Sequence, residues 1–506
     1  MLKPYNWIGV FTINTVYAKT ERFCLKEVIK EWGWKEIKNN GEGTLMWYVN
    51  SLREIDQKML NFKTWYFNRY PRSNIIWRKR QFSILMRRFQ KYFPMEYDFI
   101  PHTIVLPDEF KYFKRHMEKH KDKVLIAKPS KGRGGEGIFF VKNAYDIRKE
   151  TMRCHEYILQ DYIPNPLLID DKKFDFRMYL LVTGVDVMHA YLAFEGMVRV
   201  CTEDYTLPTK GSRSSYNQQD DLMAHLTNYT LNKNSEKYKI ETDYENANDG
   251  NKRLLSNVFI VLQEMGVDIE DLRDDLKDMS TKIVLALQPY LVNSYHIDMG
   301  TNKDGNQNWF HIFGIDILID EKHKPWLLEI NCFPSFWIFQ DKFEIDPNNG
   351  SETKVKQVSE FDKYLKTMLV REAIEIVKDN QIPDGSVYEQ VFPPKEYIDD
   401  YKELTVFNDA RILFELLSGY KRPDFLTLSQ FQKLWYFPGM QTDKLNKTTY
   451  TLIFKQFSKK ANRSLMTIDN FNSALEYIGL EMYPIGYTRL QVFTKVTKQL
   501  LDYVTV

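Results

Sequence analysis

Two segments far apart in the sequence carry residue types that together suit the phosphates of a nucleotide. The first is Lys128-Pro-Ser-Lys-Gly-Arg-Gly-Gly-Glu-Gly-Ile138, in which an apolar run ends at Lys128 and leads into a glycine-rich loop. Glycines let backbone N–H groups approach a phosphate closely, and a lysine adds a positive charge. The spacing matches neither the P-loop nor the dinucleotide fingerprint, and such a loop alone is also typical of a flexible connection.

The second segment offers oxygen ligands for a metal ion. Asp316 stands inside the otherwise apolar run 311–319, and Glu329 and Asn331 stand two residues apart in the next apolar run. Residues two apart in a strand point to the same face. Carboxylate and amide oxygens suit a Mg²⁺ ion that bridges phosphates. Carboxylates that cap a hairpin are the alternative, although their apolar neighbours offer them no partners.

A third charged segment lies between these two. Strand alternation in Lys173-Phe-Asp-Phe-Arg177 places its three charged residues on one face and its two phenylalanines on the other. Three charges on one strand face are costly unless they line a polar cavity or reach solvent. The pattern therefore fits either a polar cavity or an exposed face with salt bridges. Gln160-Asp-Tyr-Ile163, an apolar run that breaks before a proline, indicates nothing by itself.

In series, these motifs resemble a known family. Lys128-Pro with its glycine loop, Lys173-Phe-Asp-Phe-Arg177, His225-Leu-Thr-Asn228 and Leu328-Glu-Ile-Asn331 resemble the signature series of the tubulin–tyrosine-ligase-like family. Phe194-Glu-Gly-Met-Val-Arg199 fits between the second and third of these. The resemblance runs from about residue 5 to about residue 372. It implies an ATP-grasp fold, in which two α/β subdomains clamp ATP between their sheets.

The resemblance also implies residue roles. ATP would be bound by Lys128, Lys131, Gly132, Arg133, Gly134, Gly135 and Gly137 at the phosphates, by Gln160, Asp161, Tyr162 and Ile163 at the adenine, by Lys173 and Asp175 at adenine and ribose, and by Thr227 and Asn228 near the phosphates. Mg²⁺ would be ligated by Asp316, Glu329 and Asn331. Arg177 and Arg199 would be the catalytic residues that hold the acyl-phosphate and the incoming amino acid. Lys252, Cys332 and Lys363 would complete the amino-acid site.

The family's chemistry joins an amino acid to a protein. ATP phosphorylates a carboxylate of the protein substrate, and the amine of a free amino acid attacks the acyl-phosphate to give an amide or isopeptide bond. The stretches 195–199 and 228–233 look most like the glutamylating branch, so we expect glutamate to be added to glutamate side chains of tubulin tails.

Several residues depart from that branch. Cys332 replaces its usual His, and Gly134 and Glu136 stand where it usually has Gln and Arg. Glycine or tyrosine ligation therefore stays open, as does a non-tubulin acidic acceptor. An inactive tubulin-binding module is the alternative of a different class.

Composition indicates a globular protein of a reducing compartment. Hydrophobic residues make up 43% and charged residues 27% of the chain, and its net charge is +2. The four cysteines have no metal-ligand spacing. We see neither a signal peptide nor an apolar run long enough to cross a bilayer, and expect no membrane or nucleic-acid partner. We expect a cytoplasmic protein, and the resemblance implies the cytoskeleton, including the cilium or basal body.

A cluster of positive charge precedes the glycine loop. From Arg69 to Lys91 there are eight basic residues and no acidic one. Such a patch attracts acidic partners such as a tubulin tail, although it is also typical of a solvated helix face. Residues 75–93 are predicted to form an amphipathic helix around this patch.

The predicted elements give an α/β class with an added helical region. Apolar runs at 124–127, 137–141, 157–160, 177–182 and 311–319 predict strands, and 254–291 predicts helix with a break at Gly266. We expect a catalytic domain over 1–380, with an N-terminal subdomain to about 115 and an ATP-grasp core from about 116. A linker rich in Pro and Gly is expected over 381–402.

The segment 403–506 is predicted to be a helical module. Leu426–Phe431 and Leu465–Leu475 each predict a short strand followed by a helix start, as in an EF-hand pair without calcium ligands. This module is weakly similar to the p25-alpha group of microtubule-associated proteins. A helical bundle packed on the catalytic domain is the alternative.

Overall fold

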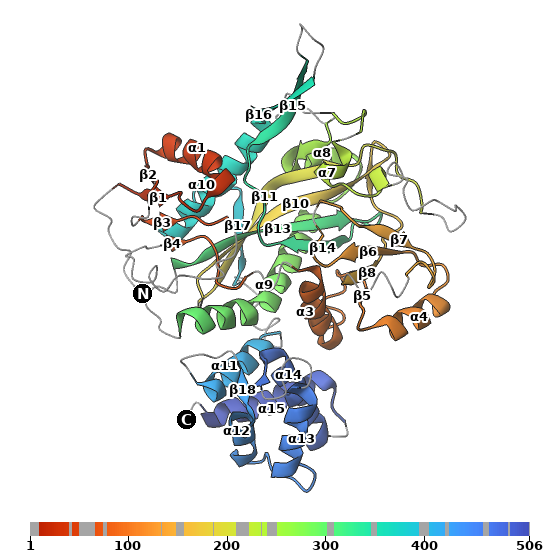
Figure 1. Ribbon diagram of the computed structural model, residues 1–506, viewed down its shortest axis with the longest axis vertical. Helices are drawn as coiled ribbons and strands as arrows, with labels where there is room; N and C mark the ends of the chain where they lie inside the picture. The colour runs from red at the N-terminus through yellow and green to blue at the C-terminus, as the bar shows by residue number, and fades with distance from the viewer. Residues whose placement is uncertain are drawn as a thin grey trace.

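The computed structural model describes residues 10–504 except 40–42, 50–65, 74–77, 133, 148–155, 186, 209–221, 234, 240–249, 301–307, 346–351, 394–403, 420–424, 459–464 and 484–485. Within these residues the chain forms a mixed α/β core, which confirms the predicted class, and helices follow at its C-terminal end (Figure 1). No helix of the described part is long and apolar enough to span a bilayer.

The core is built around an antiparallel central sheet in the order β12-β11-β10-β13-β14, with β17 added to β11 and β9 to β10. Its strands are β9 (Leu168–Ile169), β10 (Lys172–Thr183), β11 (His189–Val200), β12 (Lys252–Leu254), β13 (Phe310–Ile319), β14 (Pro325–Asn331) and β17 (Tyr388–Phe392). The strands predicted at 177–182 and 311–319 are therefore confirmed as parts of β10 and β13.

Both faces of the central sheet are buried because its middle strands are apolar on both sides. On β10, Leu180 packs into one hydrophobic cluster and Leu181 into another. Helix α9 (Ile269–Met299) belongs to the first cluster. Helices α1 (Arg22–Trp32) and α10 (Glu360–Asp379) cover the other face. Polar side chains of these strands therefore reach solvent or ligand only where the sheet is left uncovered.

The long helical segment breaks where the sequence predicted. Helix α8 (Leu255–Glu264) ends before Gly266, which has a φ of +90° that favours glycine. Helix α9 then begins after Asp268, whose carboxylate accepts the backbone N–H groups of Glu270 and Asp271. This turn separates α8 from α9.

Two smaller sheets flank the central one. An antiparallel sheet has the order β5-β8-β6-β7, and a parallel sheet near the N-terminus has the order β2-β1-β3-β4. Their strands are β1 (Thr12–Asn14), β2 (Lys35–Ile37), β3 (Leu45–Met46), β4 (Tyr66–Phe67), β5 (Thr103–Leu106), β6 (Leu125–Pro129), β7 (Phe139–Val141) and β8 (Tyr157–Asp161). Further elements are helices α3 (Lys79–Tyr92), α4 (Phe110–Lys119) and α7 (Tyr229–Asn232), and the hairpin of β15 (Phe339–Ile345) and β16 (Glu352–Val358).

The expected linker contains a strand. Residues 388–392 form β17, which pairs antiparallel with β11 at the edge of the central sheet. Tyr388 and Val391 are buried in the two clusters on either side of that sheet. The prolines and glycine around this strand dominate the sequence pattern, so its five residues did not register as an element.

The C-terminal helices form a bundle at the end of the molecule opposite the β15–β16 hairpin (Figure 1). Its elements are α11 (Val406–Ser418), β18 (Leu426–Thr427), α12 (Leu428–Phe431), α13 (Lys447–Ser458), β19 (Leu465–Met466), α14 (Ile468–Met482) and α15 (Arg489–Val504). The two predicted strand-then-helix starts are confirmed, because β18 and β19 pair and Thr427 and Thr467 cap the helices that follow.

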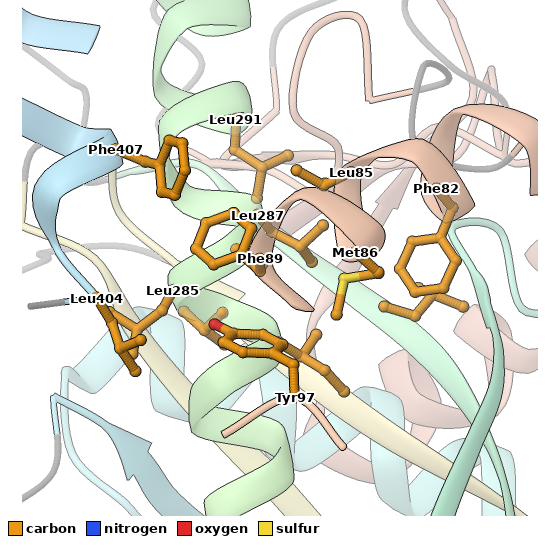
Figure 2. Packing of buried hydrophobic residues seen from close by; sticks show 14 of the residues in the cluster. Phe82, Leu85, Met86, Phe89, Tyr97, Leu285, Leu287, Leu291, Leu404 and Phe407 are labelled. Atoms are coloured by element: carbon orange, nitrogen blue, oxygen red, sulfur yellow. The ribbon is translucent and has the colours of Figure 1, made fainter. Parts of the chain in front are cut away.

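The bundle shares its hydrophobic core with the α/β part. Phe407 of α11 is 1% exposed, and its ring centroid lies 4.7 Å from that of Phe89 on α3 and 5.2 Å from that of Phe493. Figure 2 shows Phe407 and Phe89 beside Leu287 of α9. One continuous apolar cluster therefore joins the bundle to α3 and α9.

Most of the basic side chains between Arg69 and Lys91 are buried or paired with carboxylates of the protein itself. Arg69 is fully buried, and Arg80, Arg87, Arg88 and Lys91 pair with carboxylates of the chain at 2.5–2.8 Å. Two of these carboxylates, those of Asp469 and Glu476, belong to the bundle. The prediction of a free basic patch for an acidic partner is therefore not supported, because the sequence did not show where the neutralising carboxylates lie.

We expect Phe407→Ala to lower the free energy of unfolding by about 3–5 kcal/mol, because it leaves a cavity in the cluster that α3, α9 and α11 share. Chemical denaturation followed by fluorescence and circular dichroism would measure this. Phe425→Ala, which truncates a phenylalanine that is 42% exposed in the same bundle, is the control and should cost about 1 kcal/mol or less. Equal effects of the two substitutions would contradict a shared core.

Candidate nucleotide and metal site

The central sheet and the β5-β8-β6-β7 sheet border two adjoining cavities of about 100 and 530 Å³. Both cavities are lined by Lys79, Gly132, Gly134, Gln160, Arg199, Asn228, Leu328 and Glu329. The smaller is also lined by Lys128, Gly135, Asp161, Tyr162, Ile163, Lys173, Asp175, Thr227 and Asp316. The larger is also lined by Arg177 and Asn331. Residues from all the motifs that the sequence singled out therefore meet at one place.

The glycine loop closes one side of the smaller cavity. Gly134 and Gly135 have φ angles of +62° and +89°, which favour glycine. A Cβ atom on Gly134 would lie 2.8 Å from Oγ1 of Thr230, and one on Gly135 would lie 3.2 Å from Oδ1 of Asn228. The loop therefore packs closely on the residues that follow Thr227. Gly137 lies in the same loop but not on a cavity wall, Lys131 is exposed, and Arg133 lies outside the described residues.

One end of the smaller cavity is held by three polar side chains. The ammonium group of Lys173 donates to the backbone oxygen of His225 at 2.8 Å and lies 4.7 Å from the ring centroid of Tyr162. Nδ1 of His225 lies 2.8 Å from the Tyr162 hydroxyl. Burial, together with the nearby Lys173 charge, lowers the pKa of His225 to about 3, so its imidazole is neutral. An aromatic-lined end with a neutral imidazole and a hydrogen-bond-donating lysine suits a flat heterocycle such as adenine.

Lys128 carries charge into the same cavity. Its ammonium group donates to Oε1 of Gln160 at 2.7 Å, and the residue is buried. Burial is the main cause that lowers the pKa of Lys128 to about 8, and the positive charges of Lys79 and Lys173 lower it further. A phosphate at this position would stabilise the charged form of the lysine.

Two carboxylates and two guanidinium groups form a buried ion network beside Lys128. Arg199 holds Asp175 through two hydrogen bonds of 2.7 Å and reaches Asp316 at 2.8 Å. Arg177 also holds Asp316 through Nε and through Nη2, the latter at 2.9 Å. Burial would raise the pKa of Asp316, but the two guanidinium groups hold it well below its usual range. Each buried carboxylate is therefore paired with at least one guanidinium group, and Asp316 stays ionised away from bulk water.

Strand register places this network. Asp175 is opposite Arg199 across β10 and β11, and Arg177 is opposite Asp316 across β10 and β13. Gly314 leaves room for the Arg177 side chain, because a Cβ atom there would lie 3.1 Å from its Cδ atom. The predicted alternation along β10 is confirmed, since Phe174 and Phe176 pack in the core while the charged residues face the cavities.

The three residues expected to ligate a metal lie on two neighbouring strands that form one hairpin. Asp316 and Glu329 are opposite each other on β13 and β14, and Asn331 is opposite Gly314. Adjacent carboxylates repel each other unless a cation lies between or beside them. In the structure Lys79 is such a cation, and it forms an ion pair with Glu329 in which Nζ lies 3.2 Å from Oε2. The donor set fits Mg²⁺, which Asp316, Glu329 and Asn331 could hold where it neutralises phosphate charge.

Several predicted contacts are not brought to the cavities. Cys332 is fully buried in the hydrophobic cluster, with Sγ 3.6 Å from the backbone oxygen of Ser73. Lys363 pairs with Glu27 at 3.3 Å on the α10–α1 side. Lys252 pairs with Asp362 at 2.8 Å, and its ammonium group lies over the ring of Tyr229. Tyr229, rather than Lys252, lines the larger cavity. Of the four residues expected at the amino acid, Arg199 alone lines either cavity among the described residues.

Two site residues escaped the sequence analysis. Lys79 lines both cavities, with Nζ 3.2 Å from Glu329 and 3.3 Å from the backbone oxygen of Gly132, but its sequence neighbours made it look like part of a surface patch. His225 was noted as a motif residue without a role. Its place before Thr227 and Asn228 was the signal that could have identified it.

Comparison with known proteins gives the family. A family model described as the tubulin-tyrosine ligase family matches residues 56–345, which include the glycine loop, β10 and the β13–β14 hairpin. The chain belongs to the tubulin-tyrosine ligase family. The resemblance inferred from the motifs is therefore confirmed, and the match contains the residues of the cavities from Lys79 to Ser335.

Relatives within the tubulin-tyrosine ligase family share about a third of their residues with the chain. It is 35% identical over 325 residues to tubulin polyglutamylase ttll6 of Danio rerio, covering 64% of this chain and 39% of the relative. It is 33% identical over 373 residues to tubulin polyglutamylase TTLL11 of Homo sapiens, covering 72% and 50%. A probable beta-tubulin polyglutamylase of Tetrahymena thermophila is 35% identical over 271 residues, covering 53% and 22%. The chain thus spans half or less of these relatives.

Lys128 gives the site of this family member a testable pH dependence. With a pKa of about 8 in the empty cavity, it is charged below pH 8 and loses its charge above. We expect ATP affinity to fall as pH rises from about 7.5 to 9.5, and binding to take up protons near pH 8, because bound phosphate raises the lysine's pKa. Isothermal titration calorimetry in buffers of different ionisation enthalpy measures both. Lys128→Met should remove most of the effect, whereas the surface control Lys119→Met should retain it.

Proposed function

We propose that the chain is an ATP- and Mg²⁺-dependent ligase that adds glutamate to glutamate side chains of tubulin C-terminal tails. The ion network of Asp175, Arg199, Asp316 and Arg177, placed between a glycine loop and a carboxylate hairpin, carries this proposal. The names of the relatives, which are tubulin polyglutamylases, supply the acceptor and the amino acid. Microtubules and free glutamate are therefore the proposed partners, and the cytoskeleton, including the cilium or basal body, the proposed location.

The chain's own residues would divide the work between the cavities. Lys128, Lys173 and the glycine loop would hold ATP in the smaller cavity, and Asp316, Glu329 and Asn331 would hold Mg²⁺ beside it. When bound, Mg²⁺ would neutralise phosphate charge while the γ-phosphoryl group passes from ATP to the acceptor carboxylate and ADP is released. Arg177 opens onto the larger cavity, where a guanidinium can bind the carboxylates of the substrates bidentately. The amine then attacks the activated acceptor carboxylate, and phosphate leaves.

Glutamate is the proposed amino acid because the larger cavity is rich in cations. Four cationic residues, Lys79, Arg87, Arg177 and Arg199, line it against two acidic ones, Glu21 and Glu329, and Arg87 is already paired with Glu109. Glutamate brings two carboxylates, and each needs a cationic partner when it is taken from water. Since Cys332, Lys252 and Lys363 do not line the cavity, the second carboxylate would rely on the arginines and Lys79 rather than on those residues.

The architecture is proposed to be of the ATP-grasp type, because the cavities lie between two sheets that each contribute walls. We also propose that the bundle is EF-hand-like and binds no calcium, since its two strand-then-helix starts pair through β18 and β19. A catalytic domain over about 1–380 followed by a module from about 403 remains the proposed division, with β17 belonging to the catalytic sheet.

The test is mass spectrometry of microtubules after incubation with the protein, Mg²⁺, ATP and one of glutamate, glycine or tyrosine. We expect added glutamate only, and only with ATP. Arg177→Lys keeps the charge but loses the paired hydrogen bonds, so it should raise the KM for glutamate about tenfold or more. Arg371→Lys, a surface change on α10, is the control and should leave this KM unchanged.

Each other outcome has a definite meaning. Exclusive addition of glycine or tyrosine would contradict glutamate specificity and retain the ligase. No added mass, together with binding to microtubules, would contradict the enzyme and support an inactive tubulin-binding module.

A further inference from the structure

Two histidines and an aspartate converge on the side of the β5-β8-β6-β7 sheet that carries α4. His102 precedes β5, His116 lies on α4, and Asp161 ends β8. Nδ1 of His102 lies 3.4 Å from Oδ1 of Asp161, and Nε2 of His116 lies 3.8 Å from the same oxygen. All three ligand atoms lie within 4.8 Å of one another. Residues separated by up to 59 positions in sequence thus aim nitrogen and oxygen atoms at one point.

His116 brings an unused ligand atom to this point. The residue is only 8% exposed, and its Nε2 atom has no hydrogen-bond partner among the described residues. A buried polar atom without a partner is costly, and a native structure usually supplies one. At 3.8 Å the Asp161 oxygen is too far away to be a hydrogen-bond acceptor. The distance does suit two atoms that bind a common ion.

Neighbouring groups orient the other two ligands. The Tyr112 hydroxyl lies 3.1 Å from Nε2 of His102 and can accept the hydrogen there, which leaves the Nδ1 lone pair directed at the cluster. Lys123 pairs with Oδ2 of Asp161, which leaves Oδ1 for the cluster.

We propose that His102, His116 and Asp161 form a transition-metal site, with Zn²⁺ as its ion. Two imidazoles and a carboxylate favour zinc over Mg²⁺ or Ca²⁺, which prefer sets of oxygen ligands. Three protein ligands leave a fourth position for water. The site is separate from the Asp316–Glu329 hairpin, and its donor chemistry is different.

A metal bound at this site would stabilise the part of the smaller cavity's wall that the end of β8 provides. Asp161 lies directly before Tyr162 and Ile163, which line the smaller cavity, while its carboxylate contacts the histidines. A bound ion would tie the end of β8 to α4 and to the start of β5. The metal therefore has a positioning role and touches no reacting atom. This inference does not depend on the identity of the amino acid or of the acceptor.

Zinc titration of the full-length protein tests the proposal. The titration uses a fluorescent zinc chelator as competitor, with millimolar Mg²⁺ present to occupy the carboxylate hairpin and no nucleotide. We expect one Zn²⁺ to bind with a Kd of about 1 µM or tighter, and His102→Asn or His116→Asn to weaken it by about 100-fold. His323→Asn is the matched control, because His323 has a φ of +65° that asparagine tolerates well, and it should bind zinc normally.

X-ray absorption spectroscopy of the zinc-loaded wild-type protein tests the same site without relying on variants that could misfold. We expect scattering from two imidazoles and a carboxylate. Failure to bind zinc more tightly than about 10 µM, or equal zinc affinity in His116→Asn and wild type, would overturn the proposal. A sulfur-containing or imidazole-free coordination shell would overturn it as well.

Discussion

The candidate site depends on the mutual neutralisation of Asp175, Asp316, Arg177 and Arg199 inside the sheet. Buried carboxylates next to each other would be protonated or would destabilise the fold if they lacked these guanidinium partners. The two arginines keep Asp316 ionised, because they hold the pKa of its carboxyl well below its usual range. The site therefore already contains the negative charges that a metal ion would bind and the positive charges that phosphates and carboxylates would bind. Substrate binding would exchange partners within this network.

Helix α3 links the site to the C-terminal bundle through ion pairs at both of its ends. Its first residue, Lys79, contacts Glu329 and the glycine loop, whereas Arg88 and Lys91 near its other end contact Asp469 and Glu476 of the C-terminal bundle. Its apolar face packs in the cluster of Figure 2. One helix thus touches both the proposed metal ligands and the bundle, so the bundle stabilises an element of the site.

Much of the site could be predicted from local patterns. Alternation along residues 173–177 showed which side chains share a face, and the two-residue spacing of Glu329 and Asn331 indicated a common face of one strand. These inferences held because strand geometry is periodic and because the apolar partners of each face are encoded beside the charges. The break at Gly266 was readable for a different reason, because a glycine is a local signal for the end of a helix.

What failed depended on contacts between distant segments. The charges of α3 looked free because Asp108, Glu109, Asp469 and Glu476 lie far away in sequence. Cys332 directly follows Asn331, a proposed metal ligand, but at the end of β14 its side chain turns into the core, which no local pattern showed. β17 was missed because its five residues gain their stability from pairing with β11 rather than from their own sequence.

The central claim is that the carboxylate hairpin holds a metal that couples to the nucleotide. The most direct measurement is calorimetric ATP binding with Mg²⁺ and with EDTA, for the wild-type protein, Glu329→Gln and the control Glu321→Gln on the turn of the same hairpin. The account predicts that Mg²⁺ tightens ATP binding at least about tenfold in the wild type and in Glu321→Gln, and about threefold or less in Glu329→Gln. An undiminished Mg²⁺ effect in correctly folded Glu329→Gln protein would contradict it.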